Sequence, residues 1–299
     1  MQKAIIAIVV ILILGVGGYF SFKYFKTLGV VPEQEVADTT PSQNEGVTPP
    51  VDDSKTTLGT STAGHAITAY HYGKGSKEIV FVGGIHGGYS WNTVLVAREL
   101  MSYLEQNPQA VPANVKVTVI PVLNPDGLAK VVGTTENFTS GDIPSSQTQV
   151  ISGRFNGNNV DLNRNFDCDW QSTGKWQNRN VSGGSKAFSE PESAAVAAYV
   201  AGHRPSAVVV WYSAAGGVFA SSCHNGVSAE TSALTKKYAE ASGYKAYEDF
   251  DFYEITGDMV NWLAKEGIPA ISVLLTTHES VEWDKNLKGV QALLQHYAN

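Results

Sequence analysis

Short apolar runs alternate with segments of helical periodicity from Gly64 to the end of the chain, and this alternation constrains the fold more than any other feature of the sequence. Four runs have the length and apolar character of buried strands: residues 78–82, 115–122, 207–211 and 270–275. Alternating strands and helices predict an α/β fold, in which a mostly parallel sheet is covered by helices on both faces. The functional groups of such a sheet gather on the loops that follow the carboxyl ends of its strands.

Three segments among these runs predict helices. Residues 92–104 repeat apolar side chains at helical spacing. Ser189 and Glu192 have the spacing of a capping box, which predicts the start of a helix that carries residues 194–200. Residues 283–298 form an amphipathic segment that closes the chain as a helix.

The size and charge of the chain limit its partners. It has 299 residues, of which 43% are hydrophobic and 16% are charged. We expect residues 58–299, about 240 residues, to form one domain with a single large core. The net charge is −7 and no block of Lys or Arg occurs. A nucleic-acid partner is therefore not expected, because nucleic acids are bound by neutralising their phosphates.

An apolar segment near the N-terminus predicts a membrane anchor over residues 1–26. Residues 4–20 carry no charged side chain and, extended by Phe22, are long enough to span a bilayer as a helix. The aromatic residues that follow resemble an interfacial belt. They favour an uncleaved anchor over a signal peptide, whose apolar region is usually shorter. Lysines after the run slightly favour a cytoplasmic domain, but a long polar linker and a possible disulfide favour an extracytoplasmic one, which we expect.

The segment between the anchor and the domain, residues 27–57, is rich in Pro, Asp and Glu and poor in large apolar residues. Such a segment cannot bury enough surface to fold, so it predicts a disordered acidic linker. The domain is accordingly expected to begin near residue 58.

The chain contains two cysteines, Cys168 and Cys223. The sequence has no CxxC pair and no ladder of Cys and His residues, which excludes a structural zinc finger. A disulfide between the two is expected if the domain lies outside the cytoplasm, and two buried free thiols are the alternative.

Polar residues follow two of the predicted strands. The run 78–82 leads through two glycines to His86, which places this side chain at the mouth of the sheet. A lone histidine is either a functional group or a structural hydrogen-bonding residue. The run 115–122 is followed by a turn signal and by residues 154–166, which contain two arginines and several asparagines. Arginine and asparagine together suit recognition of a carboxylate, and a solvated polar loop is the alternative.

These blocks resemble, in their order, the zinc carboxypeptidase family of carboxypeptidase A-like metallopeptidases. The resemblance covers the whole domain and rests on these blocks: Gly83-Gly84-Ile85-His86, Asn124-Pro125-Asp126-Gly127, Arg154, residues 160–166, Ser189-Glu190-Pro191-Glu192 and residues 253–262. The Asp-x-Asn-Arg-Asn motif within residues 160–166 is the most specific of them. The resemblance implies a mixed, mostly parallel sheet with helices on both faces, in agreement with the pattern of strands and helices.

The resemblance also implies one zinc ion, held by a His-x-x-Glu pair and a later histidine. His86 matches the first ligand. The glutamate position falls at Tyr89, or at Ser90 if one residue is inserted, the second histidine falls at Tyr212, and the general base falls at Leu274. A neutral phenol is a poor zinc ligand at neutral pH, and leucine cannot take a proton from water. Zinc, the cofactor that the resemblance implies, is therefore expected to bind weakly or not at all.

The positions that hold the substrate do match. By resemblance, Asn163 and Arg164 bind the free C-terminal carboxylate of a peptide, and Arg154 stabilises the oxyanion. Tyr253, nine residues before Trp262, fits the tyrosine that closes over the substrate. The structural alternative for Arg164 is an ion pair with one of three nearby aspartates: Asp161, Asp167 and Asp169.

The losses fall on the metal and the base rather than on carboxylate recognition. Base catalysis alone is worth roughly 10²–10⁴ in rate. The sequence therefore predicts a domain that binds the C-termini of peptides or of cell-wall stem peptides with little or no hydrolysis. One alternative is an active membrane-anchored metallocarboxypeptidase with a rearranged zinc site, for which His224, His278 and Glu279 are candidates, although His278 is more simply interpreted as a loop or surface residue. The other is a scaffold domain with a vestigial cleft.

Overall fold

Residues 53–298 are described by the computed structural model of the protein. The predicted anchor, residues 1–26, lies outside the described residues, as does the predicted linker up to residue 52. Within the described part, no helix combines the length and the hydropathy that crossing a bilayer requires. The first strand begins at Lys55, so the folded region starts within the segment that composition assigns to the linker.

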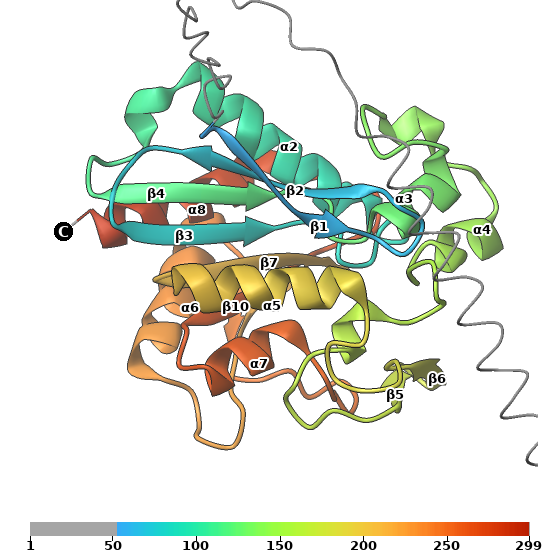
Figure 1. The fold of residues 1–299 in the computed structure, drawn as a ribbon. Helices are drawn as coiled ribbons and strands as arrows, with labels where there is room; N and C mark the ends of the chain where they lie inside the picture. The colour runs from blue at the N-terminus through green and yellow to red at the C-terminus, as the bar shows by residue number, and fades with distance from the viewer. Residues whose placement is uncertain (1–52, 299) are drawn as a thin grey trace, which may run out of the picture. The chain divides into compact units, whose positions relative to one another are not determined.

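An eight-stranded sheet forms the centre of the domain, in the order β1-β2-β4-β3-β7-β10-β8-β9. The strands β1, β2, β4, β3, β7 and β10 of this sheet are labelled in Figure 1. Its strands are β1 (Lys55–Thr60), β2 (Ala66–Tyr72), β3 (Lys77–Val82), β4 (Val115–Ile120), β7 (Ala207–Ser213), β8 (Gly217–Ala220), β9 (Lys245–Tyr247) and β10 (Ala270–Leu275). The four central strands β4, β3, β7 and β10 are parallel, and so are β8 and β9. The pairs β1–β2, β2–β4 and β10–β8 are antiparallel. The predicted mixed, mostly parallel sheet is therefore confirmed.

Helices cover both faces of the sheet, because alternate residues of its strands point to opposite sides. In β3, Val80 and Val82 belong to one core cluster and Ile79 and Phe81 to another. The first cluster includes side chains of α5 (Pro191–His203) and α7 (Met259–Lys265). The second includes side chains of α2 (Trp91–Gln106), α6 (Ala229–Ser242) and α8 (Trp283–Tyr297).

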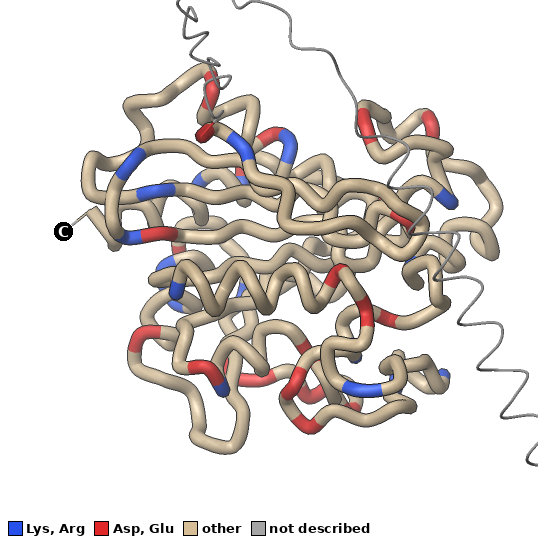
Figure 2. The backbone as a smooth tube through the Cα atoms, in the orientation of Figure 1, with Lys and Arg blue, Asp and Glu red and all other residues tan. Residues whose placement is uncertain are grey.

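Smaller elements complete the domain at the side of the sheet toward which β3 and β4 point (Figure 1). They include two short helices and a separate hairpin: α3 (Pro125–Val132), α4 (Gln147–Ser152), β5 (Thr173–Trp176) and β6 (Arg179–Ser182). Three single turns of 3-10 helix are η1 (Pro108–Ala110), η2 (Ser140–Asp142) and η3 (Leu162–Arg164). Lys and Arg positions are dispersed over the fold without forming a continuous stripe (Figure 2).

The predicted strands and helices correspond to observed elements, with one error in a helix start. The four strand runs become β3, β4, β7 and β10, and the helical segments correspond to α2, α5 and α8, although α8 ends one residue before the predicted end. The capping box is wrong, because α5 begins at Pro191 and its N-cap is Glu190, which makes no side-chain cap bond. Ser189 instead donates from Oγ to Oε1 of Glu190 at 2.8 Å. Proline suits the first helical position, since no backbone N–H is needed there.

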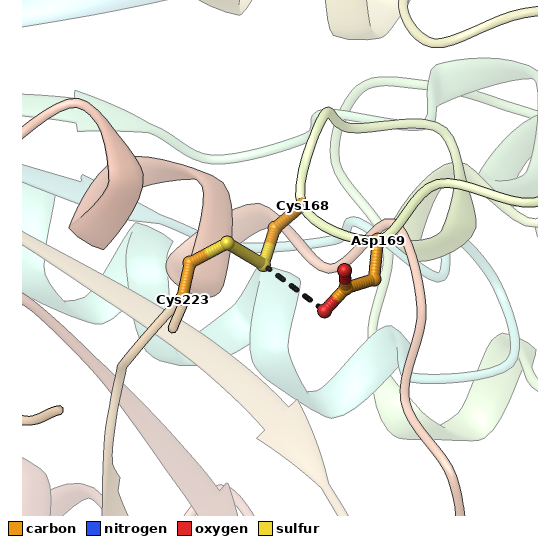
Figure 3. A group of neighbouring side chains, drawn as sticks. All are labelled: Cys168, Asp169 and Cys223. Atoms are coloured by element: carbon orange, nitrogen blue, oxygen red, sulfur yellow. Dashed lines mark hydrogen bonds between the residues drawn. A yellow bond between two sulfur atoms is a disulfide. The ribbon is translucent and has the colours of Figure 1, made fainter. Parts of the chain in front are cut away.

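Cys168 and Cys223 form a disulfide (Figure 3). Their Cα atoms are 6.1 Å apart, and the bond joins the loop after η3 to the loop after β8. The alternative of two free thiols is therefore wrong for this structure.

Candidate functional site

A cavity of about 1080 Å³ opens where the parallel strands β3, β7 and β10 end. His86 follows β3, Tyr212 lies near the end of β7, and Leu274 lies near the end of β10, and all three line the cavity. The lining also includes the remaining residues predicted to contact a ligand: Tyr89, Arg154, Asn163, Arg164 and Tyr253. The structure therefore brings these residues together, except Ser90, which is buried but does not line the cavity. Of the candidates for a rearranged zinc site, His278 lines the cavity, whereas His224 and Glu279 are exposed and do not.

The turn after β3 is the element that presents His86. Gly87 has a φ of 44°, in the left-handed region that glycine adopts without strain. A Cβ atom at Gly87 would lie 2.7 Å from the carbonyl oxygen of Gly153. The glycine therefore allows the turn to pack directly against the segment that leads into Arg154.

His86 belongs to a buried cluster with Asp161 and Arg154. Nε and Nη2 of Arg154 donate to Oδ2 of Asp161 at 2.8 and 2.7 Å, and Nε2 of His86 lies 3.3 Å from Oδ1. Burial opposes ionisation of Asp161, but Arg154 and His86 hold its pKa below the ordinary range. Burial, and then the Arg154 charge, lower the pKa of His86 to about 4. The cluster therefore combines a neutral histidine with a buried ion pair at pH 7.

Arg164 makes no ion pair with any of the three predicted aspartates, so that alternative is wrong. Each aspartate has another partner: Arg154 for Asp161, Lys265 for Asp167 and His224 for Asp169. In residues 53–298, no carboxylate oxygen lies within 4.0 Å of the Arg164 guanidinium.

The Arg164 side chain is buried, with 1% of its surface exposed, and borders the cavity. Nε and Nη2 donate to the carbonyl oxygen of Lys175 at 2.9 and 2.7 Å, and Nη1 donates to that of Asn163 at 2.5 Å. These bonds use three of the five N–H donors of a guanidinium. The Tyr253 ring centroid lies 5.9 Å from the guanidinium carbon. Within residues 53–298, the hydrogen bonds of the guanidinium thus go to backbone carbonyls. Two buried carboxylates act on its charge through space without bonding to it, those of Asp161 and Asp258.

Asn163 is fixed by bonds to protein groups. Its Nδ2 donates to Oδ2 of Asp258 at 2.7 Å, and its Oδ1 accepts from the hydroxyl of Tyr212 and from the backbone N–H of Met259, both at 3.1 Å. Burial, and then the Asp258 charge, raise the pKa of Tyr212 well above 10. Tyr212 is therefore a neutral donor to Asn163 at the position where the resemblance implies a zinc-binding histidine.

The donor set around His86 does not fit a zinc ion. A catalytic zinc takes three protein ligands. Tyr212, at the position of the second histidine, pairs with Leu274, at the position of the general base, in the β10–β7 register, so the two replaced positions are neighbours on the cavity wall. Within residues 53–298, one group of three His, Cys, Asp or Glu residues has its possible ligand atoms within 4.8 Å of one another. This group lies away from His86 and consists of Cys168, Asp169 and Cys223 (Figure 3). Both sulfur atoms of that group are consumed by the disulfide. One feature does suit a missing ligand: within residues 53–298, neither ring nitrogen of His86 makes a hydrogen bond, although Nε2 lies 3.3 Å from Oδ1 of Asp161.

His278 lies in the loop after β10, as expected, but it is half-buried and lines the cavity rather than the open surface. Its ring centroid is 4.5 Å from that of Tyr89, which in turn meets the edge of Trp176 at 5.1 Å. The guanidinium of Arg154 lies 4.5 Å from the Trp176 ring centroid and 5.6 Å from that of Tyr89. Burial, and then the Arg154 charge, lower the pKa of His278 to about 4. Aromatic rings therefore fill the region where the resemblance implies a glutamate ligand.

Three polar residues of the site were not predicted from the sequence. Asp258 caps α7 by accepting from the backbone N–H of Asn261 at 3.0 Å, and an aspartate before a helical segment is a signal that could have identified it. Asn92 and Ser213 are bonded to each other at 3.1 Å, and no sequence signal marks either of them.

A family model described as zinc carboxypeptidase matches residues 54–283, which is most of the chain. The chain belongs to the zinc carboxypeptidase family. No curated protein sequence matches it significantly. Within this zinc-dependent family, the chain is a member whose described side chains, residues 53–298, do not make up a three-ligand site around His86.

Solved structures of carboxypeptidases and of an amidase share the fold of this family member. Bovine thrombin-activatable fibrinolysis inhibitor, in complex with tick carboxypeptidase inhibitor, matches with a TM-score of 0.65 and 17% identity, over 81% of this chain and 89% of the other. Murein-tripeptide amidase MpaA from Escherichia coli O157 matches with a TM-score of 0.56 and 19% identity, over 87% and 98%. Carboxypeptidase A from Helicoverpa armigera matches with a TM-score of 0.62 and 17% identity, over 82% and 68%. At these identities the similarity establishes the fold alone.

Proposed function

We propose that this zinc carboxypeptidase-family domain binds peptides by their free C-terminal carboxylate and hydrolyses them very slowly or not at all. The observation that carries the proposal is Arg164, a buried cation that borders a large cavity and has no carboxylate partner in the described residues. Burying a charge without a directly bonded counter-charge is costly. A ligand carboxylate would supply the counter-charge, and the two unused N–H donors of the guanidinium suit its paired oxygens.

The proposed loss of hydrolysis rests on the residues at the reacting centre. Leu274 stands where the family resemblance implies the general base, and Tyr212 is a neutral phenol bonded to Asn163. Removal of a general base alone lowers a rate by roughly 10²–10⁴. A zinc ion would supply charge stabilisation and an activated water, but the part of the chain that the structure describes does not place two further ligands of the required kind near His86. Binding and catalysis are thus separable in this chain.

The ligand class that we propose is a peptide or a peptidoglycan stem peptide. Of the structures with this fold, one is named a murein-tripeptide amidase and another is in complex with tick carboxypeptidase inhibitor, and these names support the choice of ligand class. We also propose that the domain is tethered outside the cytoplasm by residues 1–26. The Cys168–Cys223 disulfide supports that location, because disulfides persist in oxidising compartments. Alkylation of the two cysteines in intact cells before any reducing agent is added would contradict it.

Calorimetry with matched peptides tests the binding proposal. The full-length chain is titrated with one peptide in its free-acid form and in its C-terminally amidated form. Charge-assisted hydrogen bonds contribute about 1.5–3 kcal/mol each, so amidation and Arg164→Ala should each weaken binding at least tenfold. Arg204→Ala, which removes an exposed arginine next to Glu266, is the matched control and should bind normally. Equal affinity for the two peptide forms would favour the scaffold alternative.

An active metallopeptidase with a rearranged site is the second candidate, and the unpartnered ring nitrogens of His86 are the observation that favours it. Elemental analysis of the purified full-length chain distinguishes it from the main proposal. We expect less than stoichiometric zinc and a melting temperature that chelators do not change. One tightly held zinc per chain, together with release of a C-terminal residue that His86→Ala abolishes, would establish the second candidate.

A further inference from the structure

Three side chains from separate elements form a hydrogen-bonded chain beside the cavity. Nδ2 of Asn92 donates to the carbonyl oxygens of Thr277 and Ser280, at 2.8 and 3.0 Å. These two bonds fix the orientation of the amide, so its Oδ1 faces Ser213 Oγ at 3.1 Å. Ser213 Oγ in turn lies 2.9 Å from Nδ1 of His278. Asn92 itself is fully buried, which makes this arrangement a fixed part of the fold.

The order of donors along this chain determines where His278 carries its proton. An amide oxygen accepts and cannot donate, so the hydroxyl of Ser213 must donate to Asn92. With its one proton used, Ser213 Oγ can only accept from His278, and Nδ1 therefore bears a hydrogen. In a neutral imidazole the other nitrogen, Nε2, is then an acceptor.

Nε2 of His278 remains available to a ligand. The residue lines the cavity, and burial and the Arg154 charge lower its pKa to about 4, so the ring is neutral at pH 7. In residues 53–298, Nε2 has no hydrogen-bond partner, yet unlike the ring nitrogens of His86 it is not enclosed by protein atoms. The packing of the ring against Tyr89 at 4.5 Å holds its plane in place.

We propose that His278 is a further ligand-binding residue, which accepts through Nε2 a hydrogen bond from a backbone N–H of the bound peptide. The proposal rests on the function proposed above, because Arg164 would hold the terminal carboxylate in the same cavity. A peptide bound by its C-terminus presents amide N–H groups from the residues that precede it, and an acceptor without a proton is what such a group requires. The cavity then binds the peptide main chain at two places, the terminal carboxylate at Arg164 and a backbone N–H at His278.

The same chain of bonds determines what Ser213 does. A serine nucleophile must give its proton to a base, and here the hydroxyl proton is directed at Asn92 rather than at His278. Ser213 is a positioning residue for His278. Acylation of Ser213 by an activated ester that enters the cavity would contradict this assignment.

Depsipeptides provide the test, because an ester removes one N–H donor with little change of shape. The full-length chain is titrated with a free-acid peptide and with analogues in which each amide near the C-terminus is replaced in turn by an ester. For the wild type, one analogue should bind about fivefold more weakly than the others, as expected for one hydrogen bond. In His278→Phe, which keeps a ring against Tyr89, the parent peptide should weaken by the same factor and that ester should cause no further loss. His203→Phe, outside the cavity, is the control and should match the wild type.

The outcomes separate this inference from the function on which it rests. If free-acid peptides bind better than amidated ones but each ester has the same effect in the wild type and in His278→Phe, the inference is wrong and the function stands. If no peptide binds, or the free and amidated forms bind equally, both are wrong. A ligand-independent readout is the ¹⁵N spectrum of histidine-labelled full-length chain at pH 7. It should show His278 protonated at Nδ1, and protonation at Nε2 instead would overturn the inference.

Discussion

Replacing Asp161 by Asn tests the electrostatics of the site directly. Arg154 is 3% exposed and donates two hydrogen bonds to the fully buried Asp161 carboxylate. Asparagine keeps the shape but removes the charge, so it leaves a buried guanidinium without its counter-ion. Breaking a buried pair in this way costs about 3–5 kcal/mol. A domain of this size loses about 2–4 °C of melting temperature per kcal/mol, so Asp161→Asn should melt roughly 10 °C lower.

Urea denaturation followed by near-ultraviolet circular dichroism measures the change in unfolding free energy. Asp167→Asn is the matched control, because Asp167 pairs with Lys265 at the same 2.7 Å distance but both side chains are nearly half exposed. Exposed pairs of this kind contribute at most about 1 kcal/mol. If Asp161→Asn were no more destabilising than Asp167→Asn, burial would not determine the strength of the Arg154 pair and the reasoning about the cluster would be refuted.

Two further predictions concern stability away from the cavity. Burial disfavours the charged form of Glu78, but bonds from Thr118 and others, and the charge of Lys116, lower its pKa below the ordinary value. The ionised form of Glu78 therefore stabilises the fold above the unfolded pKa of about 4.3, and this stabilisation is lost as the pH falls through the folded pKa. Glu78→Gln should lower the free energy of unfolding by about 1–3 kcal/mol at pH 7 and by less in acid. An equal loss at pH 7 and in acid would contradict the prediction. The Cys168–Cys223 disulfide spans 55 residues, so the double serine variant should lose about 4 kcal/mol in denaturation experiments, and an unchanged denaturation midpoint would show that the crosslink does not constrain the unfolded chain.

The sequence predicts the centre of the sheet better than its edges, for a physical reason. Strands buried on both faces are continuous apolar runs, as in residues 270–275, all of which are buried. The edge strand β1 is polar and mostly exposed, with the sequence KTTLGT, and gives no such signal. β8 is a buried strand of only four residues, GVFA, which is too short to show a period.

In the candidate site too, some features could be predicted from the sequence and others could not. Residues such as His86 and Arg164 could be assigned from a motif, because glycine turns and the Asp-x-Asn-Arg-Asn block fix their places along the chain. The partner of each charged group could not be assigned from the sequence, because only the folded structure shows that Asp161 pairs with Arg154 rather than with Arg164. The environment of His278 depends on its hydrogen bond to Ser213, which lies 65 positions earlier in the chain. No local sequence pattern encodes a contact over such a separation.

Binding without cleavage is the central claim, and one combined measurement tests both halves of it. The full-length chain is titrated calorimetrically with a free-acid peptide, and the peptide is then recovered from the same cell after prolonged incubation and weighed by mass spectrometry. We expect a binding heat that amidation of the peptide largely removes, with the peptide recovered intact. A peptide shortened by its C-terminal residue, or a free-acid peptide that gives no more heat than its amide, would contradict it.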